Sequence, residues 1–180
     1  YRVEKLRHEV LVKLPGTFQF AIITREDMLF RGVSRMYGRS FCALPPPNLG
    51  TLVLFDVFDN PMRQPIAKAA AGWKQVYEGV VTGKCDGGVL PLAQLKRFET
   101  TNRTKVLFYS NELPNQALSA GPRVTGDTKR RIRNALLSPA AAGPTKALRA
   151  ESDHVSGFVD VQPGDYDGLS FYLQYEWGFY

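Results

Sequence analysis

The sequence predicts an α/β fold in which a mostly parallel sheet is flanked by helices. Short apolar runs with strand character alternate along the chain with segments of helical periodicity, which is the pattern of successive βαβ units. The chain has 180 residues, of which 44% are hydrophobic and 22% charged, and this suits one ordinary domain or two small lobes. It has no internal repeat and no low-complexity tract, and the segment 150–164 is the one linker candidate.

The first half of the chain predicts two strands around a turn, followed by two strand–helix pairs. Apolar runs at 10–12 and 18–23 are separated by Pro15-Gly16, which indicates a turn between strands. Residues 25–39 are polar and predict a connector with a short helix. The remaining elements are a strand at 41–44, a helix at 49–58, a weak strand at 65–69 and a helix at 73–81 that ends at Gly83.

The second half predicts two more strands and then a helical end to the chain. After a strand at 85–90, Pro91 is expected to open a helix over 92–98, because proline is favoured at a helix start. A strand at 105–109 leads through the loop 110–115 to 117–120. Three helices follow: one capped by Thr125 or Asp127 and running to Leu137, one begun by Ser138-Pro139, and one over 166–177.

The charge distribution does not favour a nucleic-acid partner. The net charge is +6 at pH 7, but the basic residues are scattered, and the cluster at 129–133 has the helical spacing of a solvated helix face. No run approaches the ~18 apolar residues that a membrane helix needs, and residues 1–5 resemble the inside of a domain more than a signal peptide. A first residue other than Met fits a mature form, a fragment or the ordered part of a longer protein.

The segment 41–55 is the most suggestive of a binding site. It predicts a short buried strand, a stiff loop of three prolines and then a helix that Asn48 or Thr51 can cap. Gly50 lets a ligand approach the backbone, and the free N–H groups of a helix start favour anions. Two further loops follow strands in the same way, at Pro91-Leu92 and at 110–115. Each of these loops also fits an ordinary turn.

Other residues leave two interpretations open. Trp73 either lines a cleft or anchors a helix in the core, and Asp86 is either an acid–base group or a turn carboxylate. Cys42 and Cys85 fit a disulfide as well as two reduced core thiols. No metal site is expected, because neither cysteine has a CxxC partner and both histidines are distant in sequence. No catalytic or dinucleotide motif is present, so we expect no catalytic residue and no cofactor.

The order of five segments carries a resemblance to a known family. The first segment is Phe18–Arg25, which resembles the crossover strand, and the second is the strand 41–44 with the loop 45–51, which resembles the anion loop. The third is the helix 73–83 followed by the strand segment Lys84-Cys85-Asp86-Gly87-Gly88-Val89. The fourth is 105–109 with the loop from Ser110 to Asn115, which resembles the return strand, and the fifth is the late helix 127–137. Over residues 18–148 the chain thereby resembles the periplasmic phosphate/phosphonate-type substrate-binding proteins of ABC importers, a branch of the type 2 periplasmic binding fold.

Three departures from the family pattern bear on the ligand. Most of the first-lobe β-α-β-α-β stretch before the crossover strand is missing from this sequence. Gly72-Trp73 stands where phosphonate-binding members carry a histidine, and prolines replace hydroxyl groups in the loop 45–51. The expected ligand is therefore another oxyanion or a small carboxylate, held by backbone amides and Thr51.

The resemblance implies a two-lobed, non-enzymatic solute-binding protein that closes around its ligand by a hinge motion. Residues 1–24 would be the end of the first lobe and the crossover strand, 25–104 the second lobe, and 105–180 the return strand and C-terminal helices of the first lobe. The implied ligand-binding residues are Asn48, Leu49, Gly50, Thr51, Trp73, Pro91 and Leu92, with Ser110 and Asn115 across the cleft.

The resemblance also implies a location and partners. It places the protein in the periplasm, or outside the cell on a lipid anchor, as a monomer that works with the membrane permease of an ABC importer. The oxidising compartment and the neighbouring strands favour a Cys42–Cys85 disulfide. Two alternatives are the extracytoplasmic ligand-sensing domain of a signalling protein and a transferase-like enzyme on the same fold.

Overall fold

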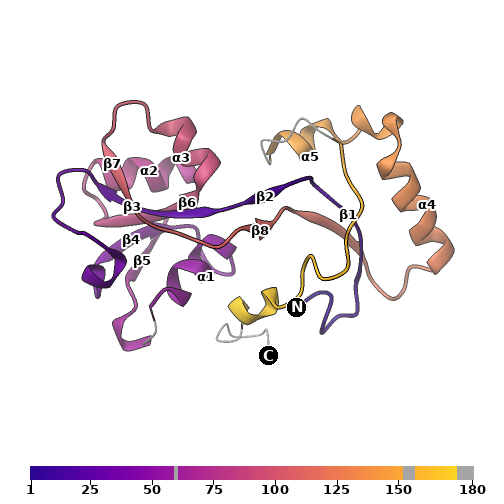
Figure 1. Cartoon of the computed structure of the whole chain (residues 1–180), viewed down its shortest axis with the longest axis horizontal. Helices are drawn as coiled ribbons and strands as arrows, with labels where there is room; N and C mark the ends of the chain where they lie inside the picture. The colour runs from indigo at the N-terminus through magenta and orange to yellow at the C-terminus, as the bar shows by residue number, and fades with distance from the viewer. Residues whose placement is uncertain (59–60, 152–156, 174–180) are drawn as a thin grey trace. The chain divides into compact units, whose positions relative to one another are not determined.

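The computed structural model describes residues 1–58, 61–151 and 157–173. The described chain forms two compact units, which we call unit 1 (residues 1–17 and 113–173) and unit 2 (residues 18–112). The chain thus leaves unit 1 after Thr17 and re-enters it at Leu113, and unit 2 is one uninterrupted segment (Figure 1). At these two passages, β2 (Thr17–Phe18) and β8 (Leu113–Pro114) form a two-stranded sheet.

Unit 2 is built on a five-stranded sheet with the order β5-β4-β6-β3-β7. Its strands are β3 (Phe20–Arg25), β4 (Ser40–Ala43), β5 (Ile66–Ala69), β6 (Gly87–Pro91) and β7 (Thr104–Tyr109). β4 pairs in parallel with β5 and β6, whereas β3 pairs antiparallel with β6 and β7. The predicted α/β class is confirmed. The prediction of a mostly parallel sheet is wrong, because β3 pairs antiparallel with both of its neighbours and the sheet is therefore mixed.

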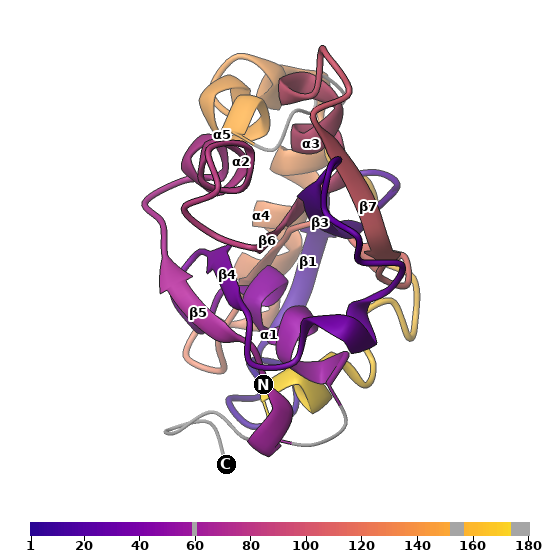
Figure 2. The same cartoon turned by 90° about the vertical axis from the view of Figure 1, so that its left-hand side faces the viewer.

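Helices cover both faces of this sheet (Figure 2). Helices α2 (Trp73–Val81) and α3 (Leu92–Phe98) cover one face, and α1 (Leu49–Asp56) covers the other. The apolar residues of α2 and α3 pack on the sheet side chains that alternate toward them and form one core cluster. Its fully or nearly buried members include Ala21, Ile23, Cys42, Val76, Val80, Leu90 and Leu95.

A disulfide lies inside this core. Cys42 of β4 and Cys85, which precedes β6, are bonded with their Cα atoms 5.7 Å apart, and both are almost fully buried. A Cβ atom at Gly79 of α2 would come within 2.5 Å of the Cys42 sulfur. Helix α2 therefore packs directly on the disulfide because residue 79 has no side chain.

Unit 1 contains a smaller antiparallel pair of strands. β1 (Glu9–Lys13) pairs with β9 (Ala117–Ala120), and a register irregularity falls between Val10 and Val12. Helices α4 (Gly126–Leu137) and α5 (Lys146–Glu151) follow along the chain. The Thr125 hydroxyl caps α4 by accepting from the Thr128 N–H, as the sequence predicted. Val12, Leu14 and Phe158 form the core of this unit.

The C-terminal third departs from three sequence predictions. Ser138-Pro139 begins a 3₁₀ turn, Pro139–Ala142, and α5 is separate from it. Over the expected last helix the structure has turns and then a 3₁₀ segment, Leu169–Leu173, while 174–177 lie outside the described residues. The expected linker 150–164 is wrong over 157–164, because Phe158 is buried and Val159 bridges to Lys13 through two backbone hydrogen bonds. Residues 152–156 of that segment lie outside the described residues.

The boundaries between the units also differ from the expected lobes. β3 and β7, predicted as the crossover and return strands of the first lobe, are both integral strands of the unit 2 sheet. Antiparallel pairing of β3 with β6 and β7 holds them there. Ser110, which follows β7, consequently belongs to unit 2 and not to unit 1.

Candidate ligand-binding site

Three helices of unit 2 begin at one edge of its sheet. β5, β4 and β6 run in the same direction, and α2, α1 and α3 begin directly or shortly after their respective carboxyl ends. β3 begins at this edge and β7 ends there, because Phe20 pairs with Pro91 and Ala21 with Tyr109. This edge is where ligands bind in open α/β sheets.

Most of the predicted site residues meet at this edge. It brings together Asn48, Leu49, Gly50, Thr51, Trp73, Pro91, Leu92 and Ser110. Asn115 belongs to unit 1, where it is buried and its side-chain amide donates to the Pro15 carbonyl at 2.7 Å. Its backbone carbonyl accepts a hydrogen bond from the Tyr166 hydroxyl, and burial raises the pKa of that phenol to about 12.

The start of α1 offers a backbone donor and little else. The Asn48 side chain caps the helix by accepting from the Gly50 N–H at 3.0 Å. The Thr51 hydroxyl, expected to be a ligand group, is buried and donates to the Leu44 carbonyl. Three prolines precede Asn48 and have no N–H to donate. Within the described part of the chain, the Leu49 N–H, the first of the helix, has no acceptor.

Two other predicted site residues are engaged in holding the edge together. The Ser110 hydroxyl accepts from the Phe20 N–H at 2.9 Å and donates to the Asn111 carbonyl at 2.7 Å. The Leu92 N–H donates to the Gln19 carbonyl at 2.8 Å. These groups fix the ends of β3, β6 and β7 relative to one another, so their contribution is to position the edge.

Phe20 is the structural centre of this edge, and the sequence reasoning missed it. Its ring lies against the start of α1, where a Cβ atom at Gly50 would come within 2.7 Å of the ring. The ring centroid is 6.1 Å from that of Trp73 at the start of α2, and 5.3 Å from that of Phe18. The signal was present in the sequence as two aromatic residues, 18 and 20, which the two-residue period of a strand places on the same face.

The edge carries no charged residue among 18–20, 44–51, 70–73, 91–92 and 109–111. Asp86 lies at the other end of β6, where it precedes the first residue of the strand. Burial disfavours its charged form, but hydrogen bonds from the Ser40 N–H and hydroxyl outweigh this and lower the pKa of the Asp86 carboxyl. Asp86 is thus a structural carboxylate that ties the start of β6 to that of β4.

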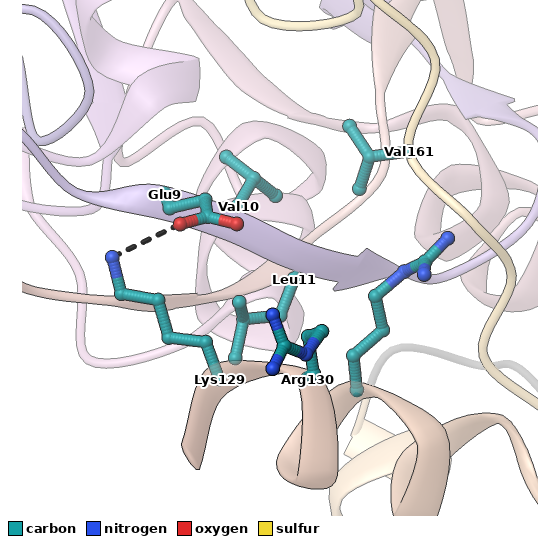
Figure 3. Close-up of a pocket in the computed structure, with 7 residues that line it drawn as sticks. Glu9, Val10, Leu11, Lys129, Arg130 and Val161 are labelled. Carbon is teal, nitrogen blue, oxygen red and sulfur yellow. Dashed lines mark hydrogen bonds and ion pairs between the residues drawn. The ribbon is translucent and has the colours of Figure 1, made fainter. Parts of the chain in front are cut away.

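The basic cluster at 129–133 lies beside a separate pocket within unit 1 (Figure 3). This pocket has a volume of about 170 Å³ and is lined by β1 residues, Val161 and the basic side chains of α4. Lys129 pairs with Glu9 at 3.0 Å, Arg130 with Asp127 at 2.8 Å and Arg133 with Asp160 at 2.7 Å. Carboxylates therefore already neutralise the three cations that line this pocket.

Comparison with known proteins identifies the family. The family described as "ABC transporter, phosphonate, periplasmic substrate-binding protein" matches residues 2–166. The chain belongs to this family. It is a solute-binding protein of an ABC importer, and such periplasmic proteins bind a small ligand and work with a permease.

No curated protein sequence matches this chain. Among the described residues, no helix is long and apolar enough to span a bilayer.

Several solved structures share the fold of this chain. XAC2383 from Xanthomonas citri bound to ATP has a TM-score of 0.71 at 18% identity, over 92% of this chain and 69% of that one. PhnD1 from Prochlorococcus marinus in complex with methylphosphonate has a TM-score of 0.69 at 11% identity, over 96% of this chain and 72% of that one.

A third structure is the binding-protein component of an ABC phosphonate transporter from Pseudomonas aeruginosa. Its TM-score is 0.62 at 16% identity, over 87% of this chain and 58% of that one, so this chain spans less than two thirds of that protein. The expected type 2 periplasmic binding fold is confirmed by these likenesses.

Proposed function

We propose that this solute-binding protein captures a small anionic ligand, an oxyanion or a small carboxylate, at the sheet edge of unit 2. The observation that carries the proposal is the Leu49 N–H, which is directed out of the first turn of α1 and is without an acceptor in the described chain. The helix macrodipole adds partial positive charge at the same place. Two of the similar structures hold ligands with oxyanion groups, ATP in the protein from Xanthomonas citri and methylphosphonate in the protein from Prochlorococcus marinus, and this supports the ligand class.

We infer a binding role without catalysis, carried out by a monomer. The residues of the edge include no histidine, cysteine, carboxylate or amine, and the hydroxyl groups of Thr51 and Ser110 are committed to backbone partners. Tyr109 is the remaining hydroxyl-bearing residue of the edge, and a single phenol without a partner base is a weak catalytic group. An acid–base or nucleophilic mechanism needs at least one such group within reach of the ligand. A transferase-like activity is therefore the weaker alternative.

The test replaces Leu49 by proline, which removes the N–H and leaves the helix intact. Proline is favoured at the first position of a helix, and Asn48 already has the extended backbone (φ −61°, ψ 129°) that a following proline requires. Leu49→Ala is the matched control, since it removes the side chain and keeps the N–H. Phosphate, methylphosphonate, sulfate, acetate and glutamate are first screened by thermal shift, where a ligand at 100 times its Kd stabilises by about 2.7 kcal/mol.

Calorimetry with the best probe should then show affinity about tenfold or more lower for Leu49→Pro, because a hydrogen bond to a charged group contributes about 1.5–3 kcal/mol. Leu49→Ala should bind within about threefold of the parent, as it keeps that hydrogen bond. Equal binding by the proline and alanine variants would contradict the proposed site. A panel in which no anion raises the melting temperature would contradict the proposed ligand class.

A further inference from the structure

Three connecting segments of unit 2 meet at the end of its sheet opposite to the candidate site. The segment 26–32 follows β3, the segment 33–39 precedes β4, and the segment 61–65 precedes β5. Because β4 and β5 are parallel and β3 runs the opposite way, all three segments adjoin the amino-terminal ends of β4 and β5. A hydrogen bond from the Ile66 N–H to the Arg39 carbonyl, 2.9 Å long, joins two of them directly.

These segments carry four arginines and two highly exposed apolar residues. We call this set the arginine patch: Arg31, Arg35, Arg39 and Arg63, with Leu29 and Met62. Two of the guanidinium groups lie over aromatic rings, Arg39 at 5.6 Å from the centroid of Phe30 and Arg63 at 5.4 Å from that of Tyr37. The rings limit where these guanidinium groups lie, so part of the positive charge is held in place.

Nearby carboxylates do not pair with the arginines of the patch. Asp27 pairs with Arg25 at 2.5 Å, and Asp56 at the end of α1 also has a partner within the chain. Asp86 is held by hydrogen bonds at the start of β4, and Arg39 acts on it only as a more distant charge. Over the described part of the chain, the patch therefore presents four exposed cations that form no ion pair.

The two apolar residues of the patch are the most exposed large hydrophobic side chains of the described chain. Leu29 is 96% exposed and Met62 is 92% exposed, ahead of Ile66 at 61%. A single exposed apolar residue is common on protein surfaces. Here two of them lie on segments that meet at one end of the sheet, each within two residues of an arginine. The patch thus combines unpaired cations with apolar side chains that have nothing to cover them.

We propose that the arginine patch holds unit 2 against a bilayer surface that carries anionic lipid headgroups. Guanidinium groups pair well with the phosphates of such headgroups. Leu29 and Met62 enter the interfacial layer, and the rings of Phe30 and Tyr37 lie at the headgroup level that aromatic side chains favour. The contact is peripheral and needs no spanning helix. It is made at the end of the sheet away from the candidate site, so it does not depend on which ligand that site takes.

A carboxylate-rich surface of another protein is the alternative occupant. The centre of a protein interface is depleted of charged residues and is apolar over a contiguous area. In the arginine patch, by contrast, Leu29 and Met62 belong to different segments and each has an arginine close by in the sequence. A headgroup layer accommodates apolar and cationic groups side by side, because long side chains place their charge among the headgroups and their apolar stems below. This mixture favours the bilayer.

Co-sedimentation of the whole chain with lipid vesicles tests the proposal. Vesicles of phosphatidylcholine with about 30% phosphatidylglycerol should bind the protein about tenfold or more tightly than vesicles of phosphatidylcholine alone, because each basic residue near an anionic surface strengthens binding about fivefold. Raising the salt concentration from about 50 to about 500 mM should release most of the bound protein, because salt screens this attraction.

A pair of charge variants tests whether the patch itself makes the contact. Arg31→Gln/Arg63→Gln should bind the anionic vesicles about tenfold or more weakly than the parent. Arg123→Gln/Arg131→Gln is the matched control, since it removes the same charge from exposed residues of unit 1. The control should bind within about threefold of the parent, because basic residues that do not lie near the bilayer gain little from it. All four positions are exposed, so the melting temperatures should stay close to that of the parent.

A third variant tests the apolar part of the contact. Leu29→Ser/Met62→Ser keeps every charge and should still bind the anionic vesicles about tenfold more weakly, because it removes the side chains that enter the bilayer. Binding like that of the parent would overturn the proposal as stated. Equal weakening by the two arginine pairs would also overturn it, since net charge alone would then explain the attraction. If the parent does not bind anionic vesicles at low salt, the bilayer is excluded and a carboxylate-rich protein surface becomes the better occupant.

Discussion

Single carboxylates fix the sheet of unit 2 at the end opposite to the candidate site. Asp86 accepts from the Ser40 N–H at 2.9 Å and from its hydroxyl at 2.8 Å, and these bonds keep its pKa below the usual value despite burial. Glu99 behaves similarly: burial opposes its charged form, but bonds from Thr104 and Arg103 lower its pKa. Both groups bind a proton less readily in the folded protein than in the unfolded chain.

A pH dependence of stability follows for Asp86. Because its folded pKa is depressed, its contribution is fully present above the unfolded value of about 3.9 and is lost as the pH falls through the folded value. Asp86→Asn should therefore lower the free energy of unfolding at pH 7, and the difference from the parent should shrink on acidification below about pH 4. Urea unfolding at a series of pH values measures this. A difference that stays constant down to pH 2.5 would contradict it.

At the same scale, the candidate site shows which residues the sequence could predict. Asn48 as a helix cap and Gly50 beside it follow from local rules, so both could be located in advance. Thr51 and Ser110 were predicted as ligand groups because both lie in loops that resemble ligand loops of the family. Their actual acceptors, the Leu44 and Asn111 carbonyls, depend on how the loops fold back, which no local pattern encodes.

At the scale of elements, helix α2 packs directly on the Cys42–Cys85 disulfide through Gly79. Cys42 and Cys85 close a loop with a sequence separation of 43 residues. In the chain-entropy model a loop of this length stabilises the fold by about 4 kcal/mol. The double variant Cys42→Ala/Cys85→Ala should lose most of this in urea unfolding, and dithiothreitol should destabilise the parent but not the variant. Two free thiols in the unfolded, non-reduced parent would contradict the bond.

The elements also show the limits of prediction from sequence. Helices α2 and α3 were predicted at their observed bounds, since their periodicity and the residues Gly83 and Pro91 are local signals. The direction of β3 was missed, because an apolar run reads the same whether its neighbours are parallel or antiparallel. The expected helix over 166–177 failed at its start, where Gly164 and Gly168 both have positive φ and favour turns.

On the scale of the whole molecule, unit 2 has the properties of an independent domain. It is a single segment, it has a covered sheet with its own core, and its disulfide is internal. The fragment 18–112 should therefore fold alone, with cooperative unfolding and dispersed amide resonances in a two-dimensional NMR spectrum. An unfolded fragment, under conditions where the full chain is folded, would show that unit 2 depends on unit 1.

The uninterrupted course of unit 2 also sets an order of assembly during synthesis. β1 cannot pair until β9 has been made, and Val10 and its partner Ser119 are separated by the whole of unit 2. The chain enters unit 2 at β3 and leaves it at β7, and these strands are adjacent and antiparallel. Once unit 2 has folded, its two ends lie side by side, and the entropy cost of closing a long loop between β1 and β9 is largely removed. A nascent chain that folds unit 2 first would thus complete unit 1 as though the intervening residues were a short turn.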